Sequence, residues 1–378
     1  MSVANDVRAL RRALHQIPEL GFQETATSSV LARELAAIGE ARPIAETGWV
    51  VDLGPADAPR TLLLRADMDG LPIREATGLA FASQHVGRMH ACGHDAHMAS
   101  LVFAARYLAA HPPAGARIRL LFQPAEEGKG GALRCIEEGV LDGVDAAFGI
   151  HVWNELPLGT VAATAGGIMA GVVDVSFRVV GRGGHGALPE RTRDPIVAAS
   201  RLVLALQTVI SREESPLAAA VMTIGMIHAG DAFNVIPDEA TLRGTVRAFN
   251  PQQEERLRAA IVRVAAGVAM TCDVGIEVDW QSYAAPTVND ADFAALAARV
   301  CEGVAGVREV RTDYRTMAGE DFGDFLAVVP GAFLLVGSGS ADGSPSEPHH
   351  SPRFEIDEGV LPLSAAIHVA IAEAWAAG

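Results

Sequence analysis

Residues 117–151, RIRLLFQPAEEGKGGALRCIEEGVLDGVDAAFGIH, contain two short apolar runs on either side of a helical stretch. The runs 117–123 and 145–151 are typical of buried strands, and the segment 131–138 between them is typical of a short helix. An earlier apolar run, TLLLR (61–65), and a helix that can begin after Asp95 extend the alternation toward the N-terminus. Strands that alternate with helices predict an α/β fold with a mostly parallel sheet and helices on its faces.

The pattern changes from residue 171 onward. VVDVSFRVVG (172–181) alternates as a half-exposed strand, and an amphipathic helix, two strands, a second helix and a final strand follow it up to residue 283. The order β-α-β-β-α-β is that of a split-βαβ, ferredoxin-like α+β unit. We therefore predict an inserted domain at 171–284 and a larger domain made of residues 1–170 and 285–378.

Composition excludes several classes of protein. At ~150 residues per domain, 378 residues predict two to three domains. With 49% hydrophobic and 20% charged residues, the chain is too apolar to be disordered. The net charge of −16 argues against nucleic-acid and membrane-surface partners. The four cysteines form no CxxC pair and no signal peptide precedes them, so we expect a reduced, cytoplasmic protein.

The segment HACGHDAH (90–97) is the densest group of possible metal ligands. Imidazole and thiolate both bind zinc-like ions, and Cys92 and His94, two residues apart on an extended loop, would point to the same side. His90 and His94 have the spacing of a helical zinc motif, but Gly93 and the lack of a glutamate beside His90 argue against it. Taken alone, the segment is equally compatible with a turn that exposes histidines and buries a cysteine.

Further candidates follow the predicted strands. QPAEEG (123–128) comes directly after a strand, where open α/β sheets place their sites, and His151 ends the next strand. His349 and His350 lie in a proline-rich loop. One glutamate, His151 and one of these two histidines bring the candidate ligands to five. A single catalytic zinc-like ion takes about three protein ligands, whereas a bridging thiolate would give three bonds to each of two ions.

A possible nucleotide motif lies at 181–186, GRGGHG, which matches G-x-G-x-x-G after a strand. In a dinucleotide site the third glycine opens a helix at once, whereas here a proline and several further residues come before the next helix near Asp194. We therefore interpret the segment as a tight glycine turn that presents His185 to a cleft.

Taken together, these and further blocks resemble the metallo-amidohydrolases that include hippurate hydrolase, bacterial aminoacylases and plant auxin-conjugate hydrolases, relatives of the carboxypeptidase G-like peptidases. The blocks are individually weak but occur in order along nearly the whole chain. They are LHQIPELGFQE (14–24), RADMDGLPI (65–73), MHACGHDAH (89–97), QPAEEG (123–128), GIHVW (149–153), GRGGHGALP (181–189), FNVIPDEATLRGTVRAF (233–249), MAGEDF (317–322) and HHSPRF (349–354).

The resemblance assigns the chemistry residue by residue. It implies two divalent metal ions, without distinguishing zinc, manganese, cobalt and nickel, and it implies that Glu126 is the general base that takes a proton from a metal-bridging water. It also implies that Asp69 does not bind metal itself but orients a histidine that does. It implies no role for Asp67. The implied metal ligands are Cys92, His94, Glu127, His151 and His350.

For the inserted domain the resemblance implies a lid that also forms a dimer or a higher homo-oligomer. His185 and Asn234 match positions that hold the carbonyl oxygen of the substrate as it becomes an oxyanion. Arg247 matches a position that grips the substrate carboxylate, although Arg243, four residues earlier, is an alternative.

The predicted reaction is hydrolysis of the amide bond of an N-acyl or N-aroyl amino acid. A carboxypeptidase or dipeptidase that uses the same site is the main alternative. Two other hypotheses are a Cys92 nucleophile with His94 or His151 as its base, which would act without metal, and a binding protein that has lost catalysis.

Overall fold

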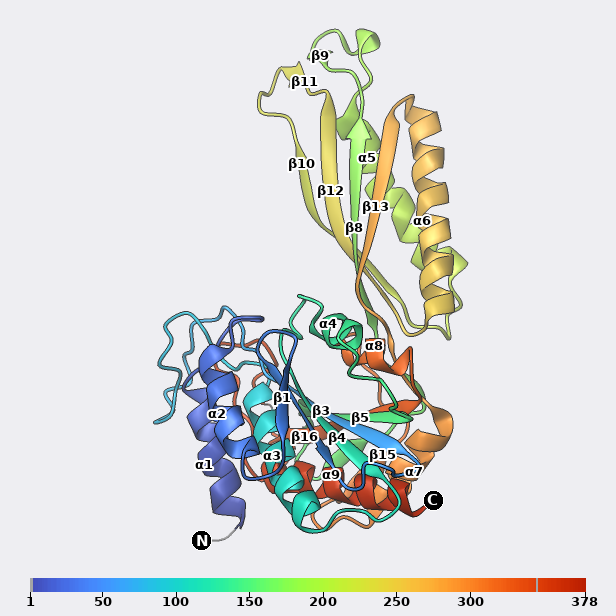
Figure 1. Cartoon of the computed structure of the whole chain (residues 1–378). Coiled ribbons are helices and arrows are strands. Elements are labelled where there is room, and N and C mark those ends of the chain that lie inside the picture. Colours follow the sequence, from blue (N-terminus) through green and yellow to red (C-terminus); the bar gives the residue numbers. More distant parts are fainter. Residues whose placement is uncertain (1–2, 345) are drawn as a thin grey trace. The chain divides into compact units, whose positions relative to one another are not determined.

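The computed structural model describes residues 3–344 and 346–378, and this part of the chain divides into two compact units (Figure 1). Unit 1 comprises Met1–Ile168, Val288–Arg315 and Asp321–Gly378, and unit 2 comprises Met169–Thr287 and Thr316–Glu320. The sequence analysis places Thr316–Glu320 in the larger domain, whereas in the structure these residues pack with unit 2. The chain passes from unit 1 to unit 2 within β7 (Gly166–Met169) and returns to unit 1 within β14 (Thr287–Asn289). These two strands pair with each other.

Unit 1 contains an eight-stranded mixed sheet whose centre is parallel. β3 pairs in parallel with β4 and β5, and β5 pairs in parallel with β16, which confirms the predicted α/β class. All seven positions of β3 are buried, as expected of a strand covered on both faces. In sheet order the strands are β1 (Ala41–Ile44), β2 (Gly48–Leu53), β4 (Arg117–Gln123), β3 (Thr61–Asp67), β5 (Ala146–Pro157), β16 (Gly331–Gly339), β6 (Thr160–Ala162) and β15 (Glu309–Arg311).

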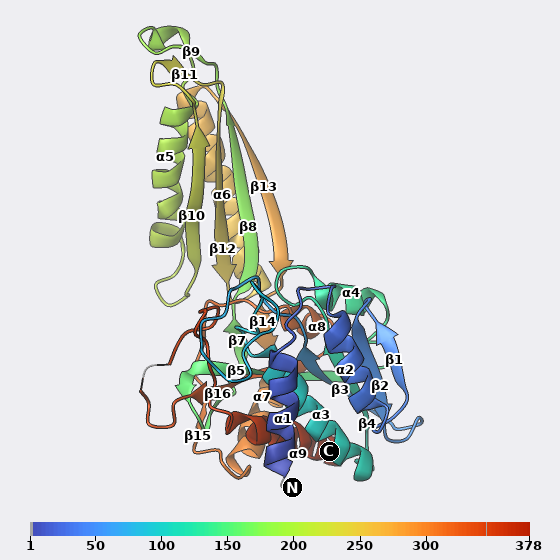
Figure 2. The ribbon, with the colours of Figure 1, turned by 90° about the vertical axis from the view of Figure 1, so that its left-hand side faces the viewer.

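Helices cover both faces of this sheet (Figure 2). On one face α1, α3, α7 and α9 pack together, and the alternate β3 residues Leu62 and Leu64 join their core. On the other face Phe322 of α8 stacks on Phe333 of β16, with ring centroids 4.9 Å apart. The apolar composition of α9, which would also suit a membrane span, is explained by its burial in this core. The helices are α1 (Val3–His15), α2 (Thr25–Leu35), α3 (His94–Ala110), α4 (Gly131–Glu137), α7 (Ala291–Glu302), α8 (Phe322–Leu326) and α9 (Val360–Ala377).

Unit 2 is an antiparallel sheet with two helices on one face, and its chain order confirms the predicted β-α-β-β-α-β unit. Along β8, Val173, Val175, Phe177 and Val179 are buried in the core that α5 and α6 close, and the residues between them are more exposed. In sheet order the strands are β10 (Val221–Ala229), β12 (Glu239–Ala248), β8 (Gly171–Val180) and β13 (Gly275–Ala284), and the helices are α5 (Pro195–Thr208), continued by a π-helical turn (Val209–Glu213), and α6 (Pro251–Cys272).

The start of α5 follows from local sequence. The Asp194 carboxylate accepts hydrogen bonds from the backbone amides of Ile196 and Val197, and Pro195 occupies the first helical turn. The segment before it forms a 3-10 turn (Pro189–Arg191) and a two-residue strand, β9 (Gly184–His185), which pairs with β11 (Val235–Ile236). The GRGGHG segment (181–186) therefore contains a short strand and is followed by a 3-10 turn rather than directly by an α-helix, as the interpretation as a glycine turn requires.

Candidate metal centre

The predicted ligands of unit 1 lie near the carboxyl ends of β3 and β4. Glu126 and Glu127 come directly after β4, and His94 is the first residue of α3. β5 continues to Pro157 instead of ending at residue 151 as predicted, but its pairing with β3 ends at Gly149, so His151 lies just beyond the paired segment, at the same edge of the sheet. Open parallel sheets place their sites at this edge.

Gly93 explains the spacing of the Cys92-Gly-His94 block. Its φ is 91°, in the left-handed region, and a Cβ atom would lie only 2.4 Å from Cγ2 of Val152. Only glycine fits both constraints. It allows the chain to turn into α3 directly after Cys92, so that residues on both sides of the turn reach the same site.

In the described part of the chain, side chains that could bind a metal form five overlapping groups, within each of which the candidate ligand atoms lie within 4.8 Å of one another; three of these groups consist of the predicted ligands and Glu126 alone. Cys92 belongs to two of the groups, which is the position that a bridging thiolate needs. Its Sγ lies 3.5 Å from Nε2 of His151, and Nε2 of His350 lies 3.3 Å from Oε1 of Glu127. These three groups are Cys92 with His94 and His151, Cys92 with Glu127 and His350, and His94 with Glu126 and Glu127.

Both ring nitrogens of His94 are buried and make no hydrogen bond to any residue that the structure describes. Burial lowers the pKa of this imidazole, but the charges of Asp67, Asp69 and Glu127 outweigh burial and raise the pKa to about 10. The pocket therefore attracts positive charge at a histidine whose ring nitrogens face carboxylates, with Nδ1 3.4 Å from Asp69 Oδ1 and Nε2 3.9 Å from Glu126 Oε2. Thiolate, imidazole and carboxylate donors around such a position fit divalent cations.

Hydrogen bonds fix the orientation of His151. Its Nδ1–H donates to the carbonyl oxygen of Val152 at 2.7 Å, which leaves Nε2 unprotonated and directed toward Cys92. His349, which the sequence analysis leaves as loop, also donates to the Val152 carbonyl, through Nε2 at 3.0 Å. Its ring stacks on Trp153 with centroids 4.6 Å apart, so His349 forms a wall beside the ligands.

The structure gives a role to Asp67 and to His97, which the sequence analysis leaves unassigned. The backbone N–H of Val152 donates to Nε2 of His97 at 2.9 Å, so the proton of this ring is on Nδ1 and is donated to Asp67 Oδ1 at 2.6 Å. Arg65 donates to the other Asp67 oxygen at 2.7 Å. This buried chain joins the carboxyl end of β3 to the strand that carries His151. In the sequence, only the presence of His97 in the dense histidine segment HACGHDAH (90–97) hints at it.

Asp69 contacts both the ligand histidine and the glutamate loop. Its Oδ1 lies 3.4 Å from Nδ1 of His94, and its two oxygens accept the backbone amides of Glu126 and Glu127, each at 3.0 Å. Asp69 is thus within reach of His94, and it also holds the backbone of Glu126, the predicted general base, and of Glu127, a predicted ligand.

The predicted oxyanion residues lie together in unit 2. His185 pairs with Val235 across the β9–β11 ladder, and the amide of Gly186 donates to the Asn234 carbonyl at 2.8 Å. Phe233, directly before Asn234, is fully exposed. We call this end of unit 2 the β9–β11 tip.

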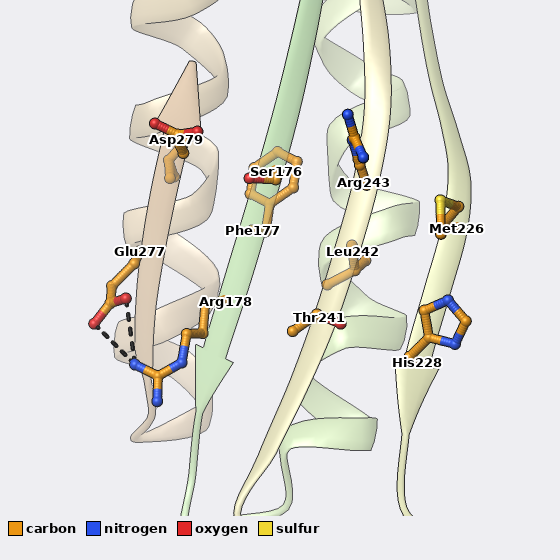
Figure 3. Close-up of a pocket in the computed structure, with 11 residues that line it drawn as sticks. Ser176, Phe177, Arg178, Met226, His228, Thr241, Leu242, Arg243, Glu277 and Asp279 are labelled. Atoms are coloured by element: carbon orange, nitrogen blue, oxygen red, sulfur yellow. Dashed lines mark hydrogen bonds and ion pairs between the residues drawn. The ribbon is translucent and has the colours of Figure 1, made fainter. Parts of the chain in front are cut away.

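The two candidate arginines differ in their partners. Arg243 donates to Asp174 at 2.7 Å, on the sheet face that is not covered by helices (Figure 3). A cavity of about 370 Å³ opens on that face, with Arg243, Arg178 and Glu277 among its lining residues, and none of the predicted ligands lines it. Arg247 is half-buried, and its Nη1 is buried with no hydrogen-bond partner in the described part of the chain. Arg247 is therefore the arginine that is available to bind an anion.

Comparisons with known proteins agree with this geometry. The model of the peptidase family M20/M25/M40 matches residues 63–374. The chain is 38% identical to a hippurate hydrolase of Campylobacter jejuni over 342 residues, 89% of each chain, and 40% identical to an IAA-amino acid hydrolase ILR1-like 2 of Arabidopsis thaliana over 369 residues, 96% of this chain and 83% of the relative. Among solved structures, the Bacillus subtilis YXEP protein, described as a dinuclear metal-binding peptidase of the M20 family, matches with a TM-score of 0.85 and 33% identity over 98% of this chain and 97% of its own.

Proposed function

The chain belongs to the peptidase family M20/M25/M40, and we propose that it hydrolyses the amide bond of N-acyl or N-aroyl amino acids. Two relatives, 38% and 40% identical to the chain, are named hydrolases of hippurate and of IAA-amino acids, which are substrates of this chemical class. The observation that carries the proposal is the shared position of Cys92 in two ligand groups, with Glu126 beside His94 in a third. Such a site has the donors for two ions and a separate carboxylate for proton transfer.

When bound, two divalent ions would polarise the scissile carbonyl and lower the pKa of the attacking water. Glu126 is placed to take the proton of that water: its side chain is 9% exposed, and its Oε2 lies 3.9 Å from Nε2 of His94. The same carboxyl oxygen then returns the proton to the leaving amine. Thiolate and imidazole favour zinc or cobalt, and the carboxylates also suit manganese or nickel.

We expect Arg247→Ala to raise KM for an N-acyl amino acid at least ~10-fold, because the variant loses a charge-assisted bond to the substrate carboxylate. An acyl amide without that carboxylate should be hydrolysed equally well by the variant and the wild type. Arg243→Ala is the matched control, since its guanidinium already binds Asp174, and its KM should stay within about twofold. The opposite result, with KM raised by Arg243→Ala alone, would move the role to Arg243.

We propose that the β9–β11 tip serves the site of a second copy of the chain, with His185 and Asn234 donating to the substrate carbonyl. The ten residues of β8 separate this tip from Gly171, near the crossing into unit 1, by about 30 Å. In unit 1 the chain re-enters at Asp321, whose carboxylate lies within 4.8 Å of that of Glu126. Because the β9–β11 tip is far along unit 2 from the residues where the chain passes into unit 1, His185 and Asn234 are suited to reach the site of a second copy. Light scattering tests this proposal, which requires a dimer or a larger homo-oligomer, and a monomer with full activity would refute it.

A substrate panel tests the proposed reaction. We expect N-benzoyl and N-acetyl amino acids to be hydrolysed at least ~10-fold faster, by kcat/KM, than dipeptides with the same C-terminal residue. Faster cleavage of the dipeptides would instead identify a dipeptidase or carboxypeptidase.

We also propose a cytoplasmic location, where the Cys92 thiolate stays reduced, and cell fractionation tests it.

A further inference from the structure

The loop that carries Glu126 contains a residue in an unfavourable backbone conformation. Ala125 has a φ of 58°, in the left-handed region that side chains other than those of Gly, Asn and Asp rarely adopt. The turn at Ala125 reverses the chain between the end of β4 at Gln123 and the glutamate pair. A conformation of this kind persists only where the surroundings hold it in place.

Glu24 is one of the groups that hold this turn. Its Oε1 accepts the backbone N–H of Ala125 at 2.9 Å, and its Oε2 accepts the hydroxyl of Thr47 at 2.7 Å. The side chain is fully buried, and burial raises the pKa of its carboxyl above the usual value even though these hydrogen bonds lower it. A carboxylate in such a position is costly unless it satisfies specific donors.

Sequence position alone would suggest another role for Glu24, since it lies at the N-cap of α2. Its side chain makes no capping bond to that helix. Glu19 takes that role instead, because its carboxylate accepts the amides of Ala26 at 3.1 Å and Thr27 at 2.9 Å. The two glutamates of the segment PELGFQE (18–24) therefore have different partners. Glu19 caps α2, and Glu24 binds the loop that carries Glu126.

Glu24 and Asp69 together hold three consecutive amides of the loop. Glu24 accepts the N–H of Ala125, and Asp69 accepts those of Glu126 and Glu127. The carbonyl of Ala125 is held as well, by the amide of Gly131 at 3.1 Å. The direction in which Glu126 points is therefore set by two buried carboxylates from elements far apart in the sequence.

We propose that Glu24 is a positioning residue for Glu126: by binding the amide of Ala125, it fixes the left-handed turn that aims the catalytic carboxylate. This inference rests on the proposed function for the role of Glu126. A displacement of about 1 Å at a reacting group can lower turnover ~100-fold, so loss of this bond should affect kcat more than substrate binding.

The test compares Glu24→Ala with Glu24→Gln and with Glu19→Ala. We expect Glu24→Ala to lower kcat ~100-fold with KM within about twofold. Glu24→Gln should recover most of the loss, because its amide oxygen still accepts the Ala125 N–H and its NH₂ can donate to Thr47. Glu19→Ala also removes a buried carboxylate of the same segment, but it should leave kcat within about threefold because that carboxylate does not touch the loop.

A second readout does not depend on activity. In metal-free protein without substrate, amide hydrogen exchange of the peptide 124–128 should be faster in Glu24→Ala than in the wild type and unchanged in Glu19→Ala. Equal kcat losses in Glu24→Ala and Glu19→Ala, or unchanged exchange of this peptide in Glu24→Ala, would overturn the proposal. If the wild type hydrolysed no acyl amino acid, the proposed function would fail, and the exchange comparison would still test the role of Glu24.

Discussion

Glu126→Gln is expected to lower kcat for an N-acyl amino acid by about 10³-fold while the protein keeps its metal. The amide of glutamine has nearly the same shape, but it cannot accept the proton of the attacking water, and general acid–base groups contribute ~10²–10⁴-fold to turnover. Metal retention follows because the predicted ligands are other residues, and the backbone amide that Glu126 donates to Asp69 is unchanged. Steady-state kinetics and elemental analysis of the same preparation check both expectations.

Two matched variants make this result specific. Glu127→Gln alters the neighbouring carboxylate, a predicted ligand near His350, and should lower metal content as well as turnover. Glu137→Gln alters an exposed carboxylate on α4 and should do neither. If Glu126→Gln kept more than about a tenth of the wild-type kcat, Glu126 would not be the general base.

The second large effect is expected from Cys92→Ser. A serine hydroxyl does not bridge two ions as a thiolate does, so metal affinity should fall by more than ~100-fold, beyond the ~10–100-fold that is typical when a group that only supports a ligand is removed. Hydrolysis should fall in parallel and should return in part when excess metal is added. Titration of the metal-free variant with zinc or cobalt, followed by activity at each concentration, measures both.

The same variant separates metal catalysis from a cysteine nucleophile. If Cys92 attacked the substrate itself, the wild type would keep its activity after exhaustive chelation, and a covalent adduct on Cys92 would be found by mass spectrometry. Cys272→Ser is the control, because this cysteine lies at the end of α6 in unit 2 and contacts Arg201 rather than any ligand. Two ions bound with wild-type affinity in Cys92→Ser would rule out the bridging role.

The features that the sequence predicts are those that depend on local pattern. Alternating apolar runs predict the parallel centre of the sheet, and the changed rhythm after residue 171 predicts the β-α-β-β-α-β unit. The edge strand β1 is not predicted, because ARPI (41–44) contains an arginine and a proline and forms a strand only by pairing with its neighbour β2. The placement of Thr316–Glu320 with unit 2 likewise depends on tertiary packing.

In the candidate site, too, some residues can be predicted from the local sequence and others depend on partners that are distant in the chain. Four of the five ligand types are recognisable because each follows a predicted strand or lies in a dense histidine motif, whereas His350 lies in a proline-rich loop and is implied by the resemblance. The roles of Asp67 and Glu24 are not, since each acts through partners that are far away in the sequence: Asp67 binds His97, and Glu24 binds Ala125. Long-range hydrogen bonds leave no periodic signal in the chain, so only the folded structure reveals them.

We propose that catalysis depends on two ions held by Cys92 and its neighbours. This dependence is tested by counting metal ions per chain in the purified protein and following N-benzoylglycine hydrolysis through chelation and stepwise return of metal. We expect about two ions per chain, loss of hydrolysis when they are removed, and recovery as they return. Full hydrolysis by metal-free protein, or full activity with no more than one ion per chain, would contradict it.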